Sequence, residues 1–211
     1  MRVQTATLDQ ARVVLFERFG YPDFRPGQVD VVASVLEGRD TLGVLPTGGG
    51  KSLCYQVPAL VLPGLTVVVS PLISLMKDQV DRLESRGVAV AYLNSTLAAE
   101  ETRARVERLK AGALKLLYVA PERLASGELT TMLRRVGVSL LAIDEAHCIS
   151  EWGHEFRPHF RRIAAARVAM GSPQVIALTA TATPQVRADI AAQLRLVNPR
   201  EIVGGFDRAN L

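Results

Sequence analysis

Residues 45–52 combine glycine, lysine and serine in a spacing that suits phosphate binding. They read Leu-Pro-Thr-Gly-Gly-Gly-Lys-Ser and follow a short apolar run. Consecutive glycines let the backbone curl so that several N–H groups point inward at a phosphate. The helix expected next adds the positive end of its dipole. The pattern predicts a phosphate-binding loop, made of Thr47, Gly48, Gly49, Gly50, Lys51 and Ser52.

Two side chains of this loop have specific chemistry. Lys51 can reach the β- and γ-phosphates of a nucleoside triphosphate, and the Ser52 hydroxyl can bind Mg²⁺. Loops of this kind usually begin with glycine, where this chain has Leu45. The plain structural alternative is a glycine-rich turn in which Gly-Lys-Ser arises by chance.

A second polar cluster follows the apolar run at 138–143 and comprises Asp144, Glu145 and His147. Two adjacent carboxylates at the end of a strand are costly unless a cation is bound. We expect Asp144 to hold Mg²⁺ and Glu145 to position and deprotonate an attacking water. Neutral imidazole is a poor ligand for Mg²⁺, so His147 is assigned to hydrogen bonding. A surface Asp-Glu pair that starts a helix is the alternative.

The elements that must position these clusters follow from the apolar pattern. Short apolar runs alternate with amphipathic segments, which predicts an α/β fold with a mostly parallel central sheet and helices on both faces. Ligands of such sheets bind at the carboxyl ends of the strands, where both clusters fall. Leu72, Leu75, Met76, Val80 and Leu83 recur at helical spacing. The expected strands are residues 41–45, 66–70, 88–93, 114–119, 138–143 and 174–178.

Composition limits the class of protein. The 211 residues are 48% hydrophobic and 22% charged, which suits one large globular domain. A net charge of +4 permits nucleic-acid binding without demonstrating it. No secretion signal or membrane-spanning run is found, so we expect a cytoplasmic protein without a membrane partner. Cys54 and Cys148 are too far apart in the chain to suggest a disulfide framework or a zinc site.

Further segments narrow the choice among phosphate-loop proteins. Residues 148–158, which follow the Asp-Glu cluster and contain the only tryptophan, are the most diagnostic of them. On these segments the chain resembles the RecQ family of DNA helicases over nearly all of its length. The resemblance implies a RecA-like fold, with ATP and Mg²⁺ as cofactors. The other segments that carry it are residues 19–28, 70–79, 93–95, 120–124 and 177–182.

The resemblance assigns residues 19–28 to adenine recognition. It implies that Gln28 hydrogen-bonds the adenine edge, that Tyr21 stacks on the base and that Arg25 supports the contact. The chemistry suits these roles, because an amide pairs with adenine and an aromatic ring stacks on any base. From the residues alone, Pro26 at a helix start with Gln28 on the exposed face is the ordinary interpretation.

The resemblance also implies a DNA-facing surface. Ser70, Lys77, Asn94 and Ser95 would face single-stranded DNA across the top of the sheet, with hydroxyls suited to phosphate contacts. The apolar members of residues 70–79, Leu72, Leu75 and Met76, are expected in the core, and Lys77 and Arg123 have the alternative of being solvated surface charges.

In the loop at 148–158, the resemblance implies that Trp152 and Phe156 stack on bases and that Arg157 connects the loop to the ATP site. Thr179 and Thr181, whose side chains point the same way from an extended strand, would couple hydrolysis to DNA through His147. The alternatives are a Trp152 packed on the core and threonines that are ordinary strand residues.

By this resemblance, residues 1–205 form the ATP-binding lobe, and residues 1–38 supply N-terminal helices with the adenine motif. Residues 206–211 would begin a linker to a second RecA-like lobe. The implied parent is a helicase that moves 3′-to-5′ on single-stranded and branched DNA in repair and recombination. We expect this piece to be monomeric and nearly inactive, because the arginine fingers, worth about 10³–10⁵-fold in turnover, belong to the second lobe.

Two other functions remain open from the sequence. One is a nucleotide-gated DNA- or protein-binding module that never hydrolyses its nucleotide. The other is an RNA helicase with the same Asp-Glu-Ala-His box, which the tryptophan loop disfavours.

Overall fold

A single sheet organises the described part of the chain, residues 6–124, 127–152 and 158–204 of a computed structural model. The sheet has seven strands in the order β3-β4-β2-β5-β6-β1-β7, and every pairing is parallel. The strands are β1 Thr41–Val44, β2 Leu65–Val69, β3 Val90–Leu93, β4 Leu116–Val119, β5 Val138–Ile143, β6 Gln174–Thr179 and β7 Arg200–Val203.

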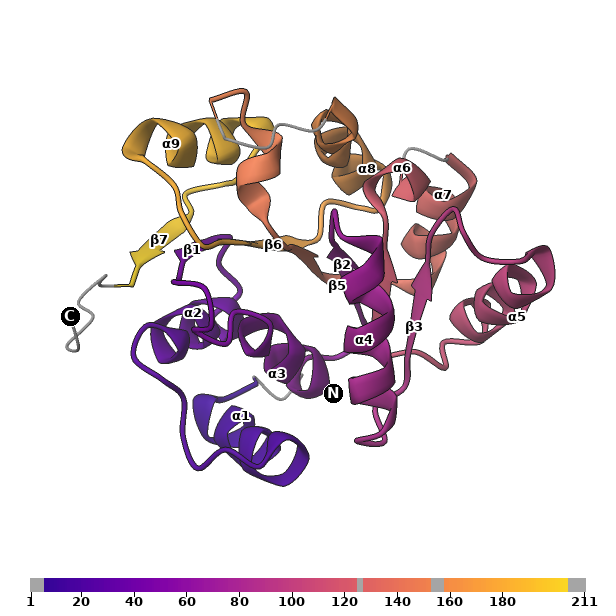
Figure 1. Cartoon of the computed structure of the whole chain (residues 1–211), viewed down its shortest axis with the longest axis horizontal. Helices are drawn as coiled ribbons and strands as arrows, with labels where there is room; N and C mark the ends of the chain where they lie inside the picture. Colours follow the sequence, from indigo (N-terminus) through magenta and orange to yellow (C-terminus); the bar gives the residue numbers. More distant parts are fainter. Residues whose placement is uncertain (1–5, 125–126, 153–157, 205–211) are drawn as a thin grey trace.

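Helices connect the strands and pack on both faces of the sheet (Figure 1). The α-helices are α1 Leu8–Val14, α2 Gln28–Leu36, α3 Leu53–Val61, α4 Ile73–Glu84, α5 Ala99–Lys110, α6 Pro121–Leu124, α7 Gly127–Val136, α8 Ile163–Ala169 and α9 Pro184–Gln193. A π-helical turn η1, Leu15–Phe19, extends α1, and two 3₁₀ turns follow β5, namely η2 Ala146–Ile149 and η3 Pro158–Arg162.

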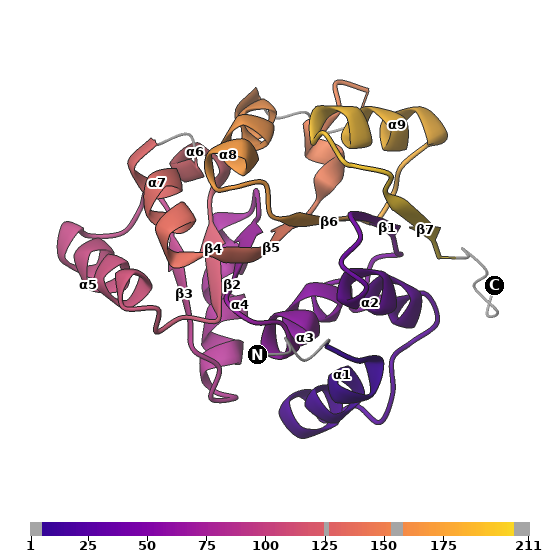
Figure 2. The ribbon, with the colours of Figure 1, turned by 180° about the vertical axis from the view of Figure 1, so that it is seen from behind.

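Two apolar layers form the core, one on each face of the sheet. In β2, Val67 and Val69 pack with α5 to α9, whereas Val68 packs with α1 to α4. Figure 2 shows the same two layers from behind. Because successive strand residues point to opposite faces, a strand buried on both sides must be apolar throughout. This requirement explains the continuous apolar runs of the sequence.

The six expected strands are present with ends that shift by no more than two residues. The expected α/β fold with helices on both faces is therefore confirmed, and the sheet is entirely parallel. A seventh strand, β7, was not expected. It lies at the sheet edge beside β1, where its residues alternate between half-buried and exposed and so lack an apolar run.

Helix α4 and the residue before it depart from the expectation at two positions. Met76, Val80 and Leu83 are buried as the spacing predicted, but Leu75 is exposed and Leu72, just before the helix, is only half-buried. The helix packs on the sheet through a narrow stripe, and Leu75 lies outside it. Within the described residues, no helix is both long enough and apolar enough to cross a membrane.

Candidate functional site

The glycine-rich loop lies at the carboxyl end of β1 and leads into α3. Gly48 and Gly50 have φ angles of 78° and 71°, in the left-handed region that side chains disfavour. A Cβ at Gly50 would lie 2.4 Å from Nε2 of Gln28, and one at Gly49 would lie 2.8 Å from the Pro46 carbonyl oxygen. Glycine is therefore required at these positions by conformation and by space.

The loop presents backbone donors that nothing in the described part of the chain uses. Gly49 donates its N–H to the Pro46 carbonyl at 2.9 Å, whereas the N–H groups of Gly48, Gly50 and Lys51 have no acceptor among the described residues. Unpaired N–H groups before a helix start favour an anion. The loop has the chemistry of a phosphate site.

The two polar clusters of the sequence meet in space. Lys51 Nζ lies 4.0 Å from Glu145 Oε1, and both side chains are largely covered. The strand order places β6 between β1 and β5, so Thr179, at the end of β6, lies between the two clusters. Residues about 90 positions apart in the chain thus share one edge of the sheet because all strands are parallel.

Asp144 is a mostly buried carboxylate without a cationic partner in direct contact. Its Oδ1 accepts a hydrogen bond from the Glu145 N–H at 3.1 Å. Burial, followed by the charge of Glu145, raises the pKa of Asp144 to about 6, although the same N–H and Lys51 act in the opposite direction. A bound cation would relieve this excess negative charge.

The available oxygen donors fit Mg²⁺ better than a metal held by protein alone. Asp144 and the Ser52 hydroxyl supply hard oxygen ligands of the kind that Mg²⁺ prefers. No group of three or more histidine, cysteine, aspartate or glutamate side chains with metal-binding geometry occurs among the residues that the structure describes. Mg²⁺ commonly completes its shell with water and substrate phosphates, so two protein ligands are sufficient.

Glu145 differs from Asp144 in backbone and in charge. Its φ of 49° is left-handed, a strained conformation for glutamate that is frequent at functional sites. The side-chain hydrogen bond with His147 lowers the pKa of Glu145, in opposition to burial. Glu145 is therefore ionised at neutral pH and can accept a proton.

His147 joins this pair to β6. Its Nδ1 lies 2.9 Å from Thr179 Oγ1 and 3.3 Å from Glu145 Oε2. The Thr179 hydroxyl donates to the Thr181 carbonyl, so Thr179 accepts from His147 and the hydrogen resides on Nδ1. The Cys148 sulfur, 3.8 Å from Nε2, and Glu145 raise the pKa of His147 to about 10. A protonated ring cannot bind a metal, which agrees with a hydrogen-bonding role.

The expectation that the Thr179 and Thr181 side chains point the same way is wrong. Strand β6 ends at Thr179, and the chain then turns back so that the Thr181 N–H and carbonyl both contact the Thr179 hydroxyl. Alternation along an extended strand no longer applies past that point. Thr179 is buried and Thr181 is exposed.

The expected adenine motif is tied to the loop. Gln28 is only 2% exposed, which contradicts the interpretation of an exposed helix residue. Its Nε2 donates to the carbonyls of Gly49 and Gly50 at 2.7 and 3.1 Å, and its Oε1 accepts from the Arg25 N–H at 2.8 Å. Arg25 Nη1 donates to the Gly48 carbonyl at 2.7 Å, and Tyr21 is exposed.

The residues expected to face DNA divide into buried and exposed groups. Ser70 and Asn94 are buried, and Asn94 Oδ1 accepts from the backbone N–H and hydroxyl of Thr96, whereas Ser95 is exposed. The exposed Lys77 pairs with Asp81.

Trp152 and Arg123 also differ in how far they are buried. Trp152 is 68% exposed, so it is not a core residue. Arg123 is not a solvated surface charge either, because its Nε is buried and has no hydrogen-bond partner in the described ranges. Phe156 and Arg157 lie outside the described residues.

A network of hydrogen-bonded side chains beneath the glycine-rich loop was not predicted from the sequence. Gln79 of α4 donates from Nε2 to Ser52 Oγ at 3.2 Å, and its Oε1 accepts from Gln56 Nε2 at 2.8 Å. Gln56 Nε2 also donates to the Tyr118 hydroxyl at 2.9 Å. The one indication of this network in the sequence was Gln56, a polar residue within the otherwise apolar helix α3.

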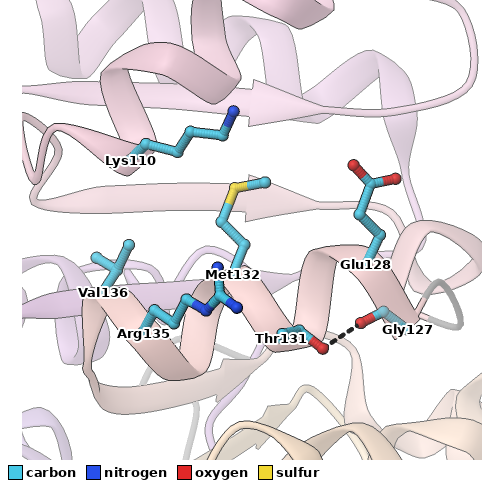
Figure 3. Close-up of a pocket in the computed structure, with 7 residues that line it drawn as sticks. All are labelled: Lys110, Gly127, Glu128, Thr131, Met132, Arg135 and Val136. Carbon is cyan, nitrogen blue, oxygen red and sulfur yellow. Dashed lines mark hydrogen bonds between the residues drawn. The ribbon is translucent and has the colours of Figure 1, made fainter.

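A separate hollow of about 670 Å³ lies between α5 and α7 (Figure 3). The Thr131 hydroxyl donates to the Gly127 carbonyl at its rim. None of the candidate site residues lines it, so it is distinct from the site at the sheet edge. Its lining residues are Lys110, Gly127, Glu128, Thr131, Met132, Arg135 and Val136.

Comparisons with known proteins agree with this geometry. The chain is 51% identical to the ATP-dependent DNA helicase RecQ of Bacillus subtilis, over 97% of the chain and 35% of that protein. It is 47% identical to the RecQ helicase of Pasteurella multocida, over 94% of the chain and 31% of that protein. A solved structure, of a hypothetical ATP-dependent RNA helicase from Sulfolobus tokodaii, aligns with a TM-score of 0.70 at 21% identity, over 93% of this chain and 56% of that one.

The parallel sheet and its structural neighbours define a RecA-like fold. The sequence pattern of the DEAD/DEAH box helicase family matches residues 25–190, and the chain belongs to that family. The resemblance to RecQ helicases that the motifs indicated is confirmed as a similarity over most of the chain. The chain spans about a third of the length of these relatives.

Proposed function

We propose that the chain is the ATP-binding motor lobe of a RecQ-type DNA helicase. The contact of 4.0 Å between Lys51 and Glu145, beside a loop with unpaired N–H groups, is the observation that carries the proposal. One edge of the sheet thereby combines phosphate donors, an ionised carboxylate and oxygen ligands for a cation. These are the groups that phosphoryl transfer from ATP to water requires.

Each residue has a role that follows from its position. Lys51 and the free N–H groups of the loop bind the phosphates, and Glu145 orients a water molecule and accepts its proton. His147 pairs with Glu145 at 3.3 Å and donates a hydrogen bond to Thr179, and so links the two. Ser52 and Asp144 would hold Mg²⁺, which supplies charge neutralisation on the phosphates when bound.

The adenine motif extends the same site. We assign Tyr21, Arg25 and Gln28 to the base, with Tyr21 as the exposed ring available for stacking. Because the Gln28 amide contacts the carbonyls of Gly49 and Gly50, adenine contact and loop shape are coupled in this proposal.

The nucleic-acid side of the proposal rests on exposed residues of the helix and loops that follow β2, β3 and β5. Ser95, Lys77 and the exposed ring of Trp152 are suited to phosphate contact and to stacking. We propose single-stranded and branched DNA as the partner, 3′-to-5′ movement, and a role in repair and recombination in the cytoplasm. Residues 1–205 would form the lobe, a monomer by itself, and residues 206–211 would lead to a second lobe.

Replacement of Lys51 tests the nucleotide site. Lys51→Ala removes the cation that reaches the phosphates, and a charge-assisted contact of this kind corresponds to a loss of about 10- to 100-fold in affinity. A fluorescent ATP analogue, titrated with Mg²⁺ into the 211-residue chain, measures the effect. Lys110→Ala, at an exposed lysine paired with Glu107, is the matched control and should bind as the unchanged chain does. Equal affinity of the Lys51 variant would remove the assignment of the loop.

A further inference from the structure

A chain of polar side chains lies beneath the glycine-rich loop. Gln56 of α3 and Tyr118 of β4 are 5% and 1% exposed, and both are surrounded by the apolar layer that contains α1 to α4. Gln79 of α4 connects them to Ser52. This network of hydrogen bonds thus links α3, α4 and β4 to the Ser52 hydroxyl of the candidate site.

Donors and acceptors match at every contact of this network. Gln56 Nε2 has two hydrogens, which it donates to Gln79 Oε1 at 2.8 Å and to the Tyr118 hydroxyl at 2.9 Å. Since the oxygen of Gln79 is occupied as an acceptor, its Nε2 must face Ser52, 3.2 Å away. Rotation of one amide alone would replace donor–acceptor contacts by unfavourable ones, so the two amides can turn only together. In either arrangement the Gln79 amide has a hydrogen bond with the Ser52 hydroxyl.

Ser52 gains a defined geometry from this contact. A hydroxyl oxygen that accepts one hydrogen bond keeps a second lone pair for a cation and its own hydrogen for an acceptor. The Tyr55 side chain is fully buried nearby, and its ring packs edge-on to Tyr118 with centroids 6.4 Å apart. Burial and the charges of Tyr118 and Asp144 raise the pKa of Tyr55, which places this hydroxyl within electrostatic reach of Asp144.

We propose that Gln79 is a positioning residue for Mg²⁺ binding: it orients the Ser52 hydroxyl and so makes the metal affinity of the nucleotide site depend on the position of α4. The inference rests on the proposed function, in which Ser52 binds Mg²⁺ beside the phosphates. Helix α4 also exposes Leu75 and Lys77 to solvent on its outer side.

A comparison of nucleotide binding with and without Mg²⁺ tests this role. Gln79→Met keeps the length of the side chain and removes its hydrogen bonds. In the 211-residue chain, the affinity for a fluorescent ATP analogue in Mg²⁺ should fall by about 5- to 10-fold, the effect of one hydrogen bond. The affinity in EDTA should stay within about 2-fold, because the phosphate-binding lysine and N–H groups are unchanged.

A second variant protects the test against a folding defect. Gln56→Leu should reduce the Mg²⁺-dependent affinity in the same direction, and the double variant should lose little more than Gln79→Met, because both act through one chain of hydrogen bonds. Gln185→Leu, at an exposed glutamine of α9, is the control and should change neither affinity.

The outcomes separate this inference from the function on which it rests. Equal losses in Mg²⁺ and EDTA would show that Gln79 has only a structural role and would overturn the inference. An unchanged affinity in Mg²⁺ would do the same. If instead the unchanged chain bound the analogue equally well with and without Mg²⁺, the assignment of Ser52 and Asp144 to the metal would fall, and this inference with it.

Discussion

Asp144 and Glu145 are neighbours in the chain and yet have opposite pKa shifts. Burial raises the pKa of Asp144 to about 6, whereas the hydrogen bond with His147 lowers that of Glu145. Adjacent carboxyl groups with separated pKa values commonly have separate tasks in catalytic sites. Asp144 suits a cation ligand, because its negative charge is unfavourable when no cation is bound. Glu145 suits a general base, because it is ionised at neutral pH.

A substitution at Asp144 should reveal its raised pKa as a pH-dependent change in the free energy of unfolding. The folded pKa of about 6 lies above the usual value of 3.8, so Asp144 destabilises the folded chain most at pH values above about 6, and this penalty declines with falling pH and is lost below 3.8. Asp144→Asn should therefore increase the free energy of unfolding by about 1–3 kcal/mol at pH 8 and by only about 0.5 kcal/mol at pH 4. Urea unfolding in EDTA without nucleotide measures both values.

The neighbouring carboxylate provides the control for that experiment. Glu145→Gln should decrease the stability at pH 8, because an ionised Glu145 is stabilised by His147. A decrease for Asp144→Asn at pH 8 would contradict the assignment of Asp144 as an uncompensated buried charge.

At the scale of elements, a buried ion pair lies at the edge of the sheet opposite the site, where the strands begin. Arg167 of α8 donates from Nη2 to both carboxylate oxygens of Asp40, at 3.1 and 2.9 Å. Asp40 also accepts the N–H groups of Val175 at 2.8 Å and Val197 at 2.9 Å. These contacts bind the amino ends of β1 and β6 to α8 and to the loop before β7. They fix the strands whose carboxyl ends carry the loop and Thr179.

Removal of the arginine should cost more than removal of an exposed one. Arg167→Ala leaves the Asp40 carboxylate buried without its cation, which typically costs about 3–5 kcal/mol. Arg12→Ala, whose partners Asp9 and Asp23 are exposed, should cost less than about 1 kcal/mol. Thermal unfolding of the two variants gives the comparison. Similar losses would mean that solvent screens the Arg167 pair despite its burial.

At the scale of the molecule, the proposed function makes the described residues one face of a nucleotide site. The relatives are about three times as long as the matched region, which covers 35% and 31% of their lengths. The resemblance to RecQ helicases implies a second RecA-like lobe, and an arginine supplied from outside a phosphate-loop site can accelerate hydrolysis by about 10³–10⁵-fold. The proposed function therefore implies a partner lobe for full activity.

Addition of a second RecA-like lobe from the same parent should restore turnover. The 211-residue chain alone should hydrolyse ATP slowly, and the added lobe should raise the rate by about 10³-fold or more through its arginine. Release of phosphate, measured with single-stranded DNA, with single-stranded RNA and without either, gives the rates. Stimulation by RNA equal to that by DNA would favour an RNA helicase. No acceleration at any concentration of the second lobe would favour a binding module that does not hydrolyse ATP.

The sequence by itself determined the features that depend on neighbouring residues. Six strands follow from continuous apolar runs, because a strand covered on both faces cannot contain exposed polar positions. The glycine-rich loop and the Asp-Glu pair follow from local chemistry at strand ends, and parallel strands bring such ends to one edge. The convergence of Lys51 and Glu145 was therefore predictable before their distance was known.

Only the tertiary structure decided the contacts between distant segments. Strand β7 forms because the edge of β1 offers hydrogen bonds, not because its residues are apolar. Gln28 is buried because the loop carbonyls accept its amide hydrogens, and Leu75 is exposed because α4 packs through other residues. Gln56 contacts partners 23 and 62 positions away. A hydrogen bond between side chains has no sequence period, so its partners are fixed only when packing brings their elements together.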